Sequence, residues 1–265
     1  MKSRLTEAFD YIKNSVENQK IYEYLDLIEG TKKNINIPVI ASINCASPDL
    51  WTDFAEKIQN AGADAIELNI SNLPSNIEKS SSDYEKIYFD IISNVFQKVN
   101  IPLSLKMNQF SAGLSNLIRK IDYTKKVKSF VLFNRFYSPD IDIENFKINY
   151  SNVFSSDKDY TIPLRWVALL SGKLQAELIS STGIHNAESL IKQILAGANA
   201  VQIVSVIYEK NPKYINVILD GLKNWMQSHN MKSLKDFKGK MNYSSIKNPS
   251  DFERIQFMKY YGGII

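Results

Sequence analysis

A short stretch about two-thirds of the way along the chain combines hydroxyl groups and glycine in a way that suits an anion. An apolar run stops at Ser180, Ser181, Thr182 and Gly183, and the sequence continues as an amphipathic helix. The first backbone N–H groups of a helix have no partner within it, and the helix dipole favours negative charge there. Serine and threonine add donors, and Gly183 allows a close backbone approach. The stretch predicts either an anion site or an ordinary capped turn, because Ser and Thr are common helix caps.

The composition is that of an ordinary globular protein. Of the 265 residues, 44% are hydrophobic and 23% are charged, and the formal net charge is +4. The charges are interspersed, so no basic block indicates a nucleic-acid partner. The apolar runs are too short to span a bilayer, and the charged amphipathic helix predicted directly after Met1 does not have the pattern of a signal peptide. Cys45 is the only cysteine, which excludes a disulfide framework and fits a reducing cytoplasm.

Six β-rich segments largely alternate with segments of helical periodicity. Strands are predicted at Pro38–Ile43, Ala65–Ile70, Pro102–Met107, Ser129–Phe133, Ala176–Ser180 and Ala200–Val204. Helices are predicted at Trp51–Ala61, Tyr84–Val99 and Ala187–Ala196. Gly62 and Gly197 end two of these helices in the similar phrases NAGADAIEL and LAGANAVQI. This alternation predicts a parallel sheet with helices outside it.

Alternation within the strands favours a barrel over a doubly wound sheet. Leu103, Leu105 and Met107 share one face of their strand, and Ser104 and Lys106 share the other. Most of the other strands also carry a polar group near their end on one face. A doubly wound sheet is covered by helices on both faces and needs apolar residues on both. A barrel has its active site at the C-terminal mouth of the strands, which predicts this pattern, although solvated strand ends would also produce it.

We expect one domain spanning residues 1–265. It comprises N-terminal helices over 1–34, the strand–helix units and a C-terminal tail over 230–265. A polar excursion at 141–161 follows the fourth strand and predicts a loop or a small antiparallel insertion. A complete (β/α)8 barrel needs eight strands, and six are recognisable. The predicted fold class is therefore α/β, a TIM (β/α)8-type barrel that is incomplete.

Nine motifs in order resemble the dihydroorotate dehydrogenase family, most closely its bacterial dihydroorotate dehydrogenase-like members. They are ASIN, ADAIELNIS, IPLSLKM, VLFNRF, RFYSPDIDIENF, LRWVALLSG, STGIHNAES, AGANAVQIVSVIY and SLKDFKGK. Each motif is weak alone, but nine in this order are specific. They cover nearly all of the chain from about Tyr22 onward. The resemblance begins at the family's third βα unit, so the first two units are expected to be missing.

The resemblance implies an FMN-containing barrel that oxidises dihydroorotate to orotate in pyrimidine biosynthesis. In the family, the turn after the seventh strand and the end of the eighth bind the FMN phosphate. Those positions here are Ser181, Thr182 and Gly183, then Val204 and Ser205. The family usually has Gly-Gly in the first turn and Gly-Thr in the second, where this chain has Thr182-Gly183 and Val204-Ser205. A backbone cradle can survive both changes, but valine in place of glycine requires the φ of Val204 to stay negative. The resemblance also implies a small-molecule substrate and a homodimer.

Further site residues follow from the same resemblance. Lys106 matches a lysine that contacts the flavin ring, where a cation stabilises the anionic reduced flavin. A structural lysine paired with Glu67 is the alternative. Asn69 and Asn134 match asparagines that bind the substrate, and Asn44 lies at an equivalent strand end. An amide donates and accepts hydrogen bonds, which suits a pyrimidine edge, but asparagine is also a common turn residue.

The position of the family's general base departs from the pattern. The family reads Asn-x-Ser-Cys/Ser-Pro-Asn, and this chain reads NISNLPSN, which places Asn72 where Cys or Ser removes a substrate proton. An amide cannot accept that proton, and Ser71 has the wrong side-chain parity. Cys45, just past the first predicted strand, is either a substitute base or a small buried residue.

Two readings of the activity therefore stay open. One is an FMN-dependent oxidoreductase, and the other is a catalytically inactive barrel fragment that binds phosphate or a nucleotide. His185 and His229 are interpreted as structural or surface residues. No spacing of His, Asp or Glu predicts a metal site.

Overall fold

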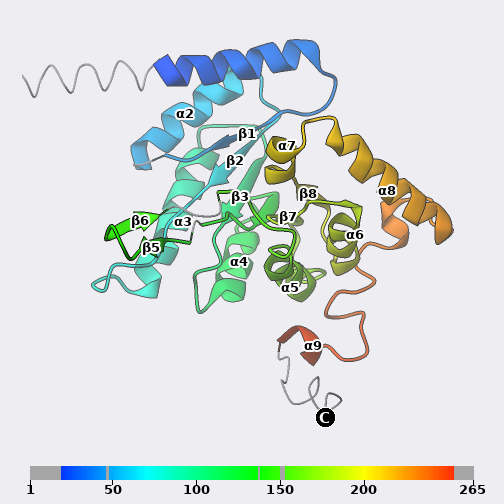
Figure 1. Cartoon of the computed structure of the whole chain (residues 1–265). Coiled ribbons are helices and arrows are strands. Elements are labelled where there is room, and N and C mark those ends of the chain that lie inside the picture. The colour runs from blue at the N-terminus through cyan, green and yellow to red at the C-terminus, as the bar shows by residue number, and fades with distance from the viewer. Residues whose placement is uncertain (1–18, 46–47, 137, 150–152, 254–265) are drawn as a thin grey trace, which may run out of the picture. The chain divides into compact units, whose positions relative to one another are not determined.

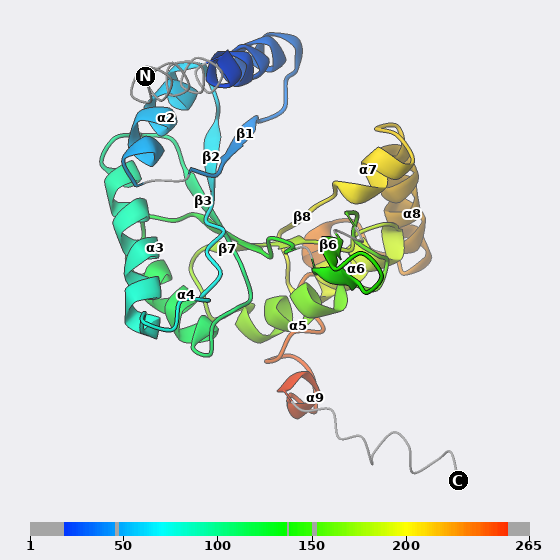
Figure 2. The ribbon, with the colours of Figure 1, turned by 60° about the vertical axis from the view of Figure 1, so that its left-hand side comes forward.

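The computed structural model describes residues 19–45, 48–136, 138–149 and 153–253 (Figures 1 and 2). The six predicted strands are all present, as β1 (Ile40–Ile43), β2 (Ala65–Asn69), β3 (Leu103–Met107), β4 (Ser129–Leu132), β7 (Glu177–Ser181) and β8 (Ala200–Gln202). The longer helices are α2 (Pro48–Asn60), α3 (Ser81–Phe96), α4 (Leu114–Tyr123), α5 (Thr161–Leu170), α6 (Ala187–Ala196) and α8 (Tyr214–Ser228). The shorter ones are α7 (Ser205–Glu209), η1 (Leu234–Asp236) and α9 (Ser250–Glu253).

The six strands form one sheet in the order β1-β2-β3-β4-β7-β8. The pairs β1–β2, β4–β7 and β7–β8 are parallel. A doubly wound sheet reverses its strand order at a switch point. The order here never reverses, as expected for consecutive units of a (β/α) barrel. The predicted fold class, an incomplete TIM-type barrel, is confirmed.

Contacts divide the described residues into two compact units. Those within Met1–Asn69 and Lys86–Ser104 form the first, and those within Ile70–Glu85 and Leu105–Ile265 form the second. The organisation of residues 1–265 as one domain stays a prediction. The helix predicted directly after Met1 falls largely outside the described residues, although 19–34 are helical. No helix of the described part is both long and apolar enough to cross a membrane.

The first unit is built on the parallel pair β1–β2, in which Ile43 lies opposite Leu68. Ile66 and Leu68 are fully buried, as the apolar parity of β2 predicts. The residue between them, Glu67, points to the opposite face and is also buried. Its Oε1 accepts a hydrogen bond from Ser42 Oγ of β1 at 2.7 Å. The face of the β1–β2 pair opposite Ile66 and Leu68 is therefore polar at this level.

The second unit contains the strands and turns that carry most of the predicted site. All four residues of β4 are buried, and Val131 lies opposite Ile179 of β7. Helix α6 begins and ends where the sequence predicts. Its N-cap Asn186 forms a capping box with Ser189, and Gly197 ends it with a φ of 116°. The predicted insertion contains an antiparallel hairpin of β5 (Asp140–Asp142) and β6 (Lys147–Asn149).

Candidate functional site

The turns that follow β7 and β8 line one cavity of about 200 Å³, which we call the turn cavity. Its lining is Lys106, Asn134, Arg135, Val153, Ser155, Ser181, Thr182, Gly183, Ile184, Gln202, Val204 and Ser205. Parallel neighbours place the ends of β7 and β8 at the same edge of the sheet, which brings the two turns together. All six residues predicted to bind a cofactor are therefore in one place: Lys106, Ser181, Thr182, Gly183, Val204 and Ser205.

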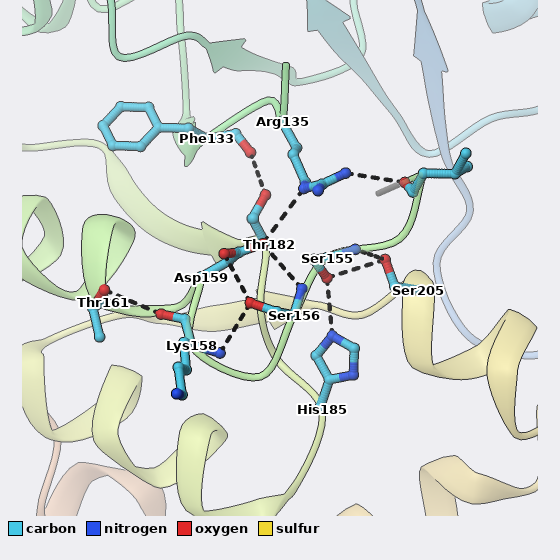
Figure 3. A network of polar contacts seen from close by, with 11 residues as sticks. Phe133, Arg135, Ser155, Ser156, Lys158, Asp159, Thr161, Thr182, His185 and Ser205 are labelled. Atoms are coloured by element: carbon cyan, nitrogen blue, oxygen red, sulfur yellow. Dashed lines mark hydrogen bonds and ion pairs between the residues drawn. The ribbon is translucent and has the colours of Figure 1, made fainter. Parts of the chain in front are cut away.

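The first turn has an unusual backbone that leaves two donors available. Thr182 and Gly183 have φ values of 86° and 78°. The strained Thr182 is held by its hydroxyl, which donates to the carbonyl of Phe133 at 3.1 Å (Figure 3). Within the described part of the chain, the N–H groups of Gly183 and Ile184 have no hydrogen-bond acceptor. Backbone N–H groups in such a turn are suited to an anion.

Gly183 also lies in close contact with a separate segment of the second unit. A Cβ at this position would lie 2.1 Å from the backbone nitrogen of Tyr160 and 2.6 Å from the carbonyl carbon of Asp159. Both neighbours belong to the segment that leads into α5. Only glycine lets the turn pack this closely against that segment, so the shape of the turn cavity depends on it.

The charges around the turn cavity favour an anion. Its lining contains two cations, Lys106 and Arg135, and no carboxylate. Lys106 lies on the polar face of β3 and donates from Nζ to Gln202 Oε1 at 2.8 Å. Arg135 donates from Nη1 to the carbonyl of Val153 at 3.0 Å, and its Nε lies 3.5 Å from Asp159 Oδ2 (Figure 3). Asp159 offsets part of the charge of Arg135, and the lining still suits an anionic group better than a neutral or cationic one.

The second turn carries a hydroxyl network that sequence reasoning missed. Val204 has a φ of −134°, on the negative side that its side chain requires. The next residue, Ser205, accepts hydrogen bonds from Ser155 N and Ser155 Oγ, both at 3.0 Å. Ser155 Oγ in turn lies 2.9 Å from His185 Nε2 (Figure 3). His185 is thus joined to the lining of the turn cavity, and its position directly after the predicted anion turn was the available signal.

Asn134 lines both the turn cavity and a larger neighbouring one of about 470 Å³, which we call the aromatic cavity. The lining of the aromatic cavity is Leu73, Gln109, Phe110, Phe133, Asn134, Arg135, Phe136, Ser138, Pro139, Asp159, Ile162, Pro163 and Thr182. Phe110 and Phe136 meet edge to face, with ring centroids 5.1 Å apart. The other predicted substrate residues belong to the first unit. Asn44 directly follows β1, and Asn69 is the last residue of β2.

The residues considered as a general base are poorly suited to that role. Asn72 lies in the loop after β2, where its backbone carbonyl accepts from Asn108 Nδ2 at 2.6 Å. The preceding Ser71 is exposed, and the following Leu73 lines the aromatic cavity. Burial raises the pKa of the Cys45 thiol to about 11, so it stays protonated at neutral pH. Among the residues that the structure describes, no group of three His, Cys, Asp or Glu side chains is placed to hold a metal ion.

The family model and the similar proteins found by comparison all carry the same family name. The family model described as dihydroorotate dehydrogenase matches residues 9–226. The chain is 27% identical over 223 residues to the "Dihydroorotate dehydrogenase B (NAD(+)), catalytic subunit" of Thermoplasma volcanium, covering 80% of this chain and 73% of that protein. It is 27% identical to the protein of the same name from Pyrococcus furiosus, covering 80% and 72%. It is 25% identical to "Putative dihydroorotate dehydrogenase A (fumarate)" of Aeropyrum pernix, covering 84% and 73%.

Proposed function

The chain belongs to the dihydroorotate dehydrogenase family, and we propose that it is an FMN-dependent oxidoreductase that converts dihydroorotate to orotate in pyrimidine biosynthesis. The observation that carries this proposal is the turn cavity, where both turns meet beside two cations and no lining carboxylate. The relatives, at 23–27% identity, bear dehydrogenase names, which does not favour an inactive phosphate-binding barrel.

The residues of the turn cavity fit the phosphate of FMN. The available N–H groups of Gly183 and Ile184 and the hydroxyls of Ser181 and Ser205 supply donors to phosphate oxygens. Lys106 adds a cation that favours negative charge on the flavin ring. When bound, FMN supplies the redox chemistry by accepting two electrons from the substrate.

We place the substrate at Asn134, which lines both cavities. Its amide donates and accepts hydrogen bonds, as a pyrimidine edge requires. Asn69 is proposed as a further substrate contact because it matches a family position, and Asn44 because it lies at an equivalent strand end. Leu73 lines the aromatic cavity and directly follows Asn72, so the loop of the base position borders the same space as Asn134. Since Asn72 cannot take up a proton, we expect substrate oxidation by the natural chain to be slow.

The cofactor is tested by adding FMN to the purified chain and titrating with dihydroorotate without oxygen. We expect stoichiometric FMN binding and slow bleaching of the flavin absorbance. Lys106→Met is expected to weaken FMN binding by about tenfold to a hundredfold, because it removes one charge-assisted contact. Lys120→Met is the matched control, since Lys120 is exposed and pairs with Glu85. A natural chain that binds no FMN, or equal affinities in both variants, would contradict the assignment.

We also propose that the protein acts in the cytoplasm as a homodimer. A single cysteine in 265 residues suits a reducing compartment. The dimer is proposed from the family resemblance. Light scattering on the purified chain is expected to give twice the mass of one chain, and the mass of one chain would contradict the dimer.

A further inference from the structure

Three side chains from separate segments form a hydrogen-bonded line that ends at the turn cavity (Figure 3). His185 lies between β7 and α6, Ser155 lies in the segment before α5, and Ser205 is the first residue of α7. Nε2 of His185 is 2.9 Å from Ser155 Oγ, which is 3.0 Å from Ser205 Oγ. Ser155 is 8% exposed, so the centre of the line is shielded from water.

The direction of these hydrogen bonds follows from counting protons. A hydroxyl has one proton to donate and two lone pairs to accept with. The geometry makes Ser155 Oγ the donor to Ser205 Oγ, so the proton of Ser155 is used there. The bond between Ser155 and His185 therefore needs its proton from His185 Nε2. The other ring nitrogen, Nδ1, lies 3.6 Å from Glu209 Oε2, which is beyond hydrogen-bond distance and leaves Nε2 able to carry the proton. The line runs from the imidazole to Ser155 and then to Ser205.

The proton of Ser205 remains available at the end of the line. Ser205 Oγ accepts from both the backbone N–H and the hydroxyl of Ser155, which uses its two lone pairs. Among the described residues its own O–H finds no acceptor, although Ser205 lines the turn cavity. An acceptor-only ligand oxygen completes this arrangement, whereas a metal cation would meet an oxygen whose lone pairs are occupied.

We propose that His185 is a positioning residue: acting through Ser155, it holds the Ser205 hydroxyl as a donor for a phosphate monoester in the turn cavity. This rests on the proposed function, in which that monoester is FMN, and goes beyond it by assigning selectivity for the phosphate to His185. If His185 offered no proton at Nε2, Ser155 would be free to donate to the imidazole instead. The Ser205 hydroxyl would then no longer be held as an acceptor with its proton toward the ligand.

The test compares FMN with riboflavin, which lacks the phosphate, by flavin fluorescence quenching on the full chain. Ser205→Ala and His185→Asn are expected to bind FMN about tenfold to a hundredfold more weakly, the effect of one hydrogen bond to a charged group. Riboflavin affinity is expected to stay within about twofold. His185→Gln is expected to retain most FMN affinity, because its amide N–H reaches the place of Nε2 whereas asparagine reaches only that of Nδ1.

The other Ser–His pair of the described chain is the matched control. Ser228 Oγ lies 3.0 Å from His229 Nδ1 at the end of α8, exposed and apart from the cavity lining. Ser228→Ala and His229→Asn are expected to leave both affinities unchanged. Melting temperatures without flavin show whether a variant has lost its fold. If Ser205→Ala or His185→Asn has lost it, Ser155→Ala takes the place of that variant in the comparison.

The outcomes separate the two proposals. If the natural chain binds FMN no better than riboflavin, the turn cavity does not hold the phosphate and both proposals fail. If the natural chain prefers FMN but His185→Asn and His185→Gln bind it equally well, FMN remains the cofactor and the role of His185 is wrong. A loss of FMN and riboflavin affinity in equal proportion would show that His185 only supports the fold.

Discussion

Replacing Asn72 with cysteine is expected to raise the rate of dihydroorotate oxidation by roughly 10²–10⁴-fold, the usual contribution of a positioned general base. The amide of Asn72 cannot accept a proton, and a thiolate can. The loop should keep its place, because Asn108 Nδ2 binds the backbone carbonyl of residue 72 and not the side chain that is replaced. Anaerobic stopped-flow measurement of flavin bleaching, with FMN saturating, checks the rate.

Two further variants control for the site of the base. Asn72→Ala provides neither a base nor an amide and should stay as slow as the natural chain. Cys45→Ser should also leave the rate unchanged, because a thiol with a pKa of about 11 is almost entirely protonated at neutral pH. A natural chain that already turns over quickly, and loses that rate in Cys45→Ser, would instead identify Cys45 as the base.

The substitution Gly183→Ala is expected to lower the free energy of unfolding by about 2–5 kcal/mol and to abolish measurable FMN binding. Two costs combine: about 1–2 kcal/mol for a left-handed backbone with a Cβ, and about 1–3 kcal/mol for overpacking. The added Cβ would lie 2.1 Å from the backbone nitrogen of Tyr160, so backbone must move to accommodate it. Urea denaturation measures the stability, and flavin fluorescence measures FMN binding.

Gly172→Ala separates the two costs. Gly172 has the same φ of 78°, but nothing lies within 4 Å of its added Cβ. It should therefore show only the conformational cost, about 1–2 kcal/mol, and keep its FMN affinity. Equal losses of stability in the two variants would show that the close packing of Gly183 against Tyr160 adds no cost to the substitution.

The elements of the fold could be predicted from the sequence because their signals are local. Helix α6 begins after the capping residue Asn186 and ends at Gly197, and both signals lie within a few residues of the ends they set. The alternation in β3 likewise places Lys106 on the polar face, since successive side chains point to opposite sides. The excursion after the fourth strand lacked such a signal, so the sequence left a loop and an antiparallel insertion as alternatives. The pairing of Ile141 with Ile148 in the structure identifies it as a hairpin.

The sequence by itself also marked the two turns of the turn cavity, through hydroxyl and glycine residues and the family motifs. Only the tertiary structure decided which other groups join them. Ser155 and Ser205 are fifty residues apart in the chain, and their contact depends on how the segment before α5 packs beside the start of α7. The position of His185 directly after the first turn was the only signal in the sequence, and its role became visible only when its imidazole lay beside Ser155. Local sequence sets strands, caps and parity, whereas a hydrogen-bonded line between three segments exists only once long-range packing has brought them within 3 Å.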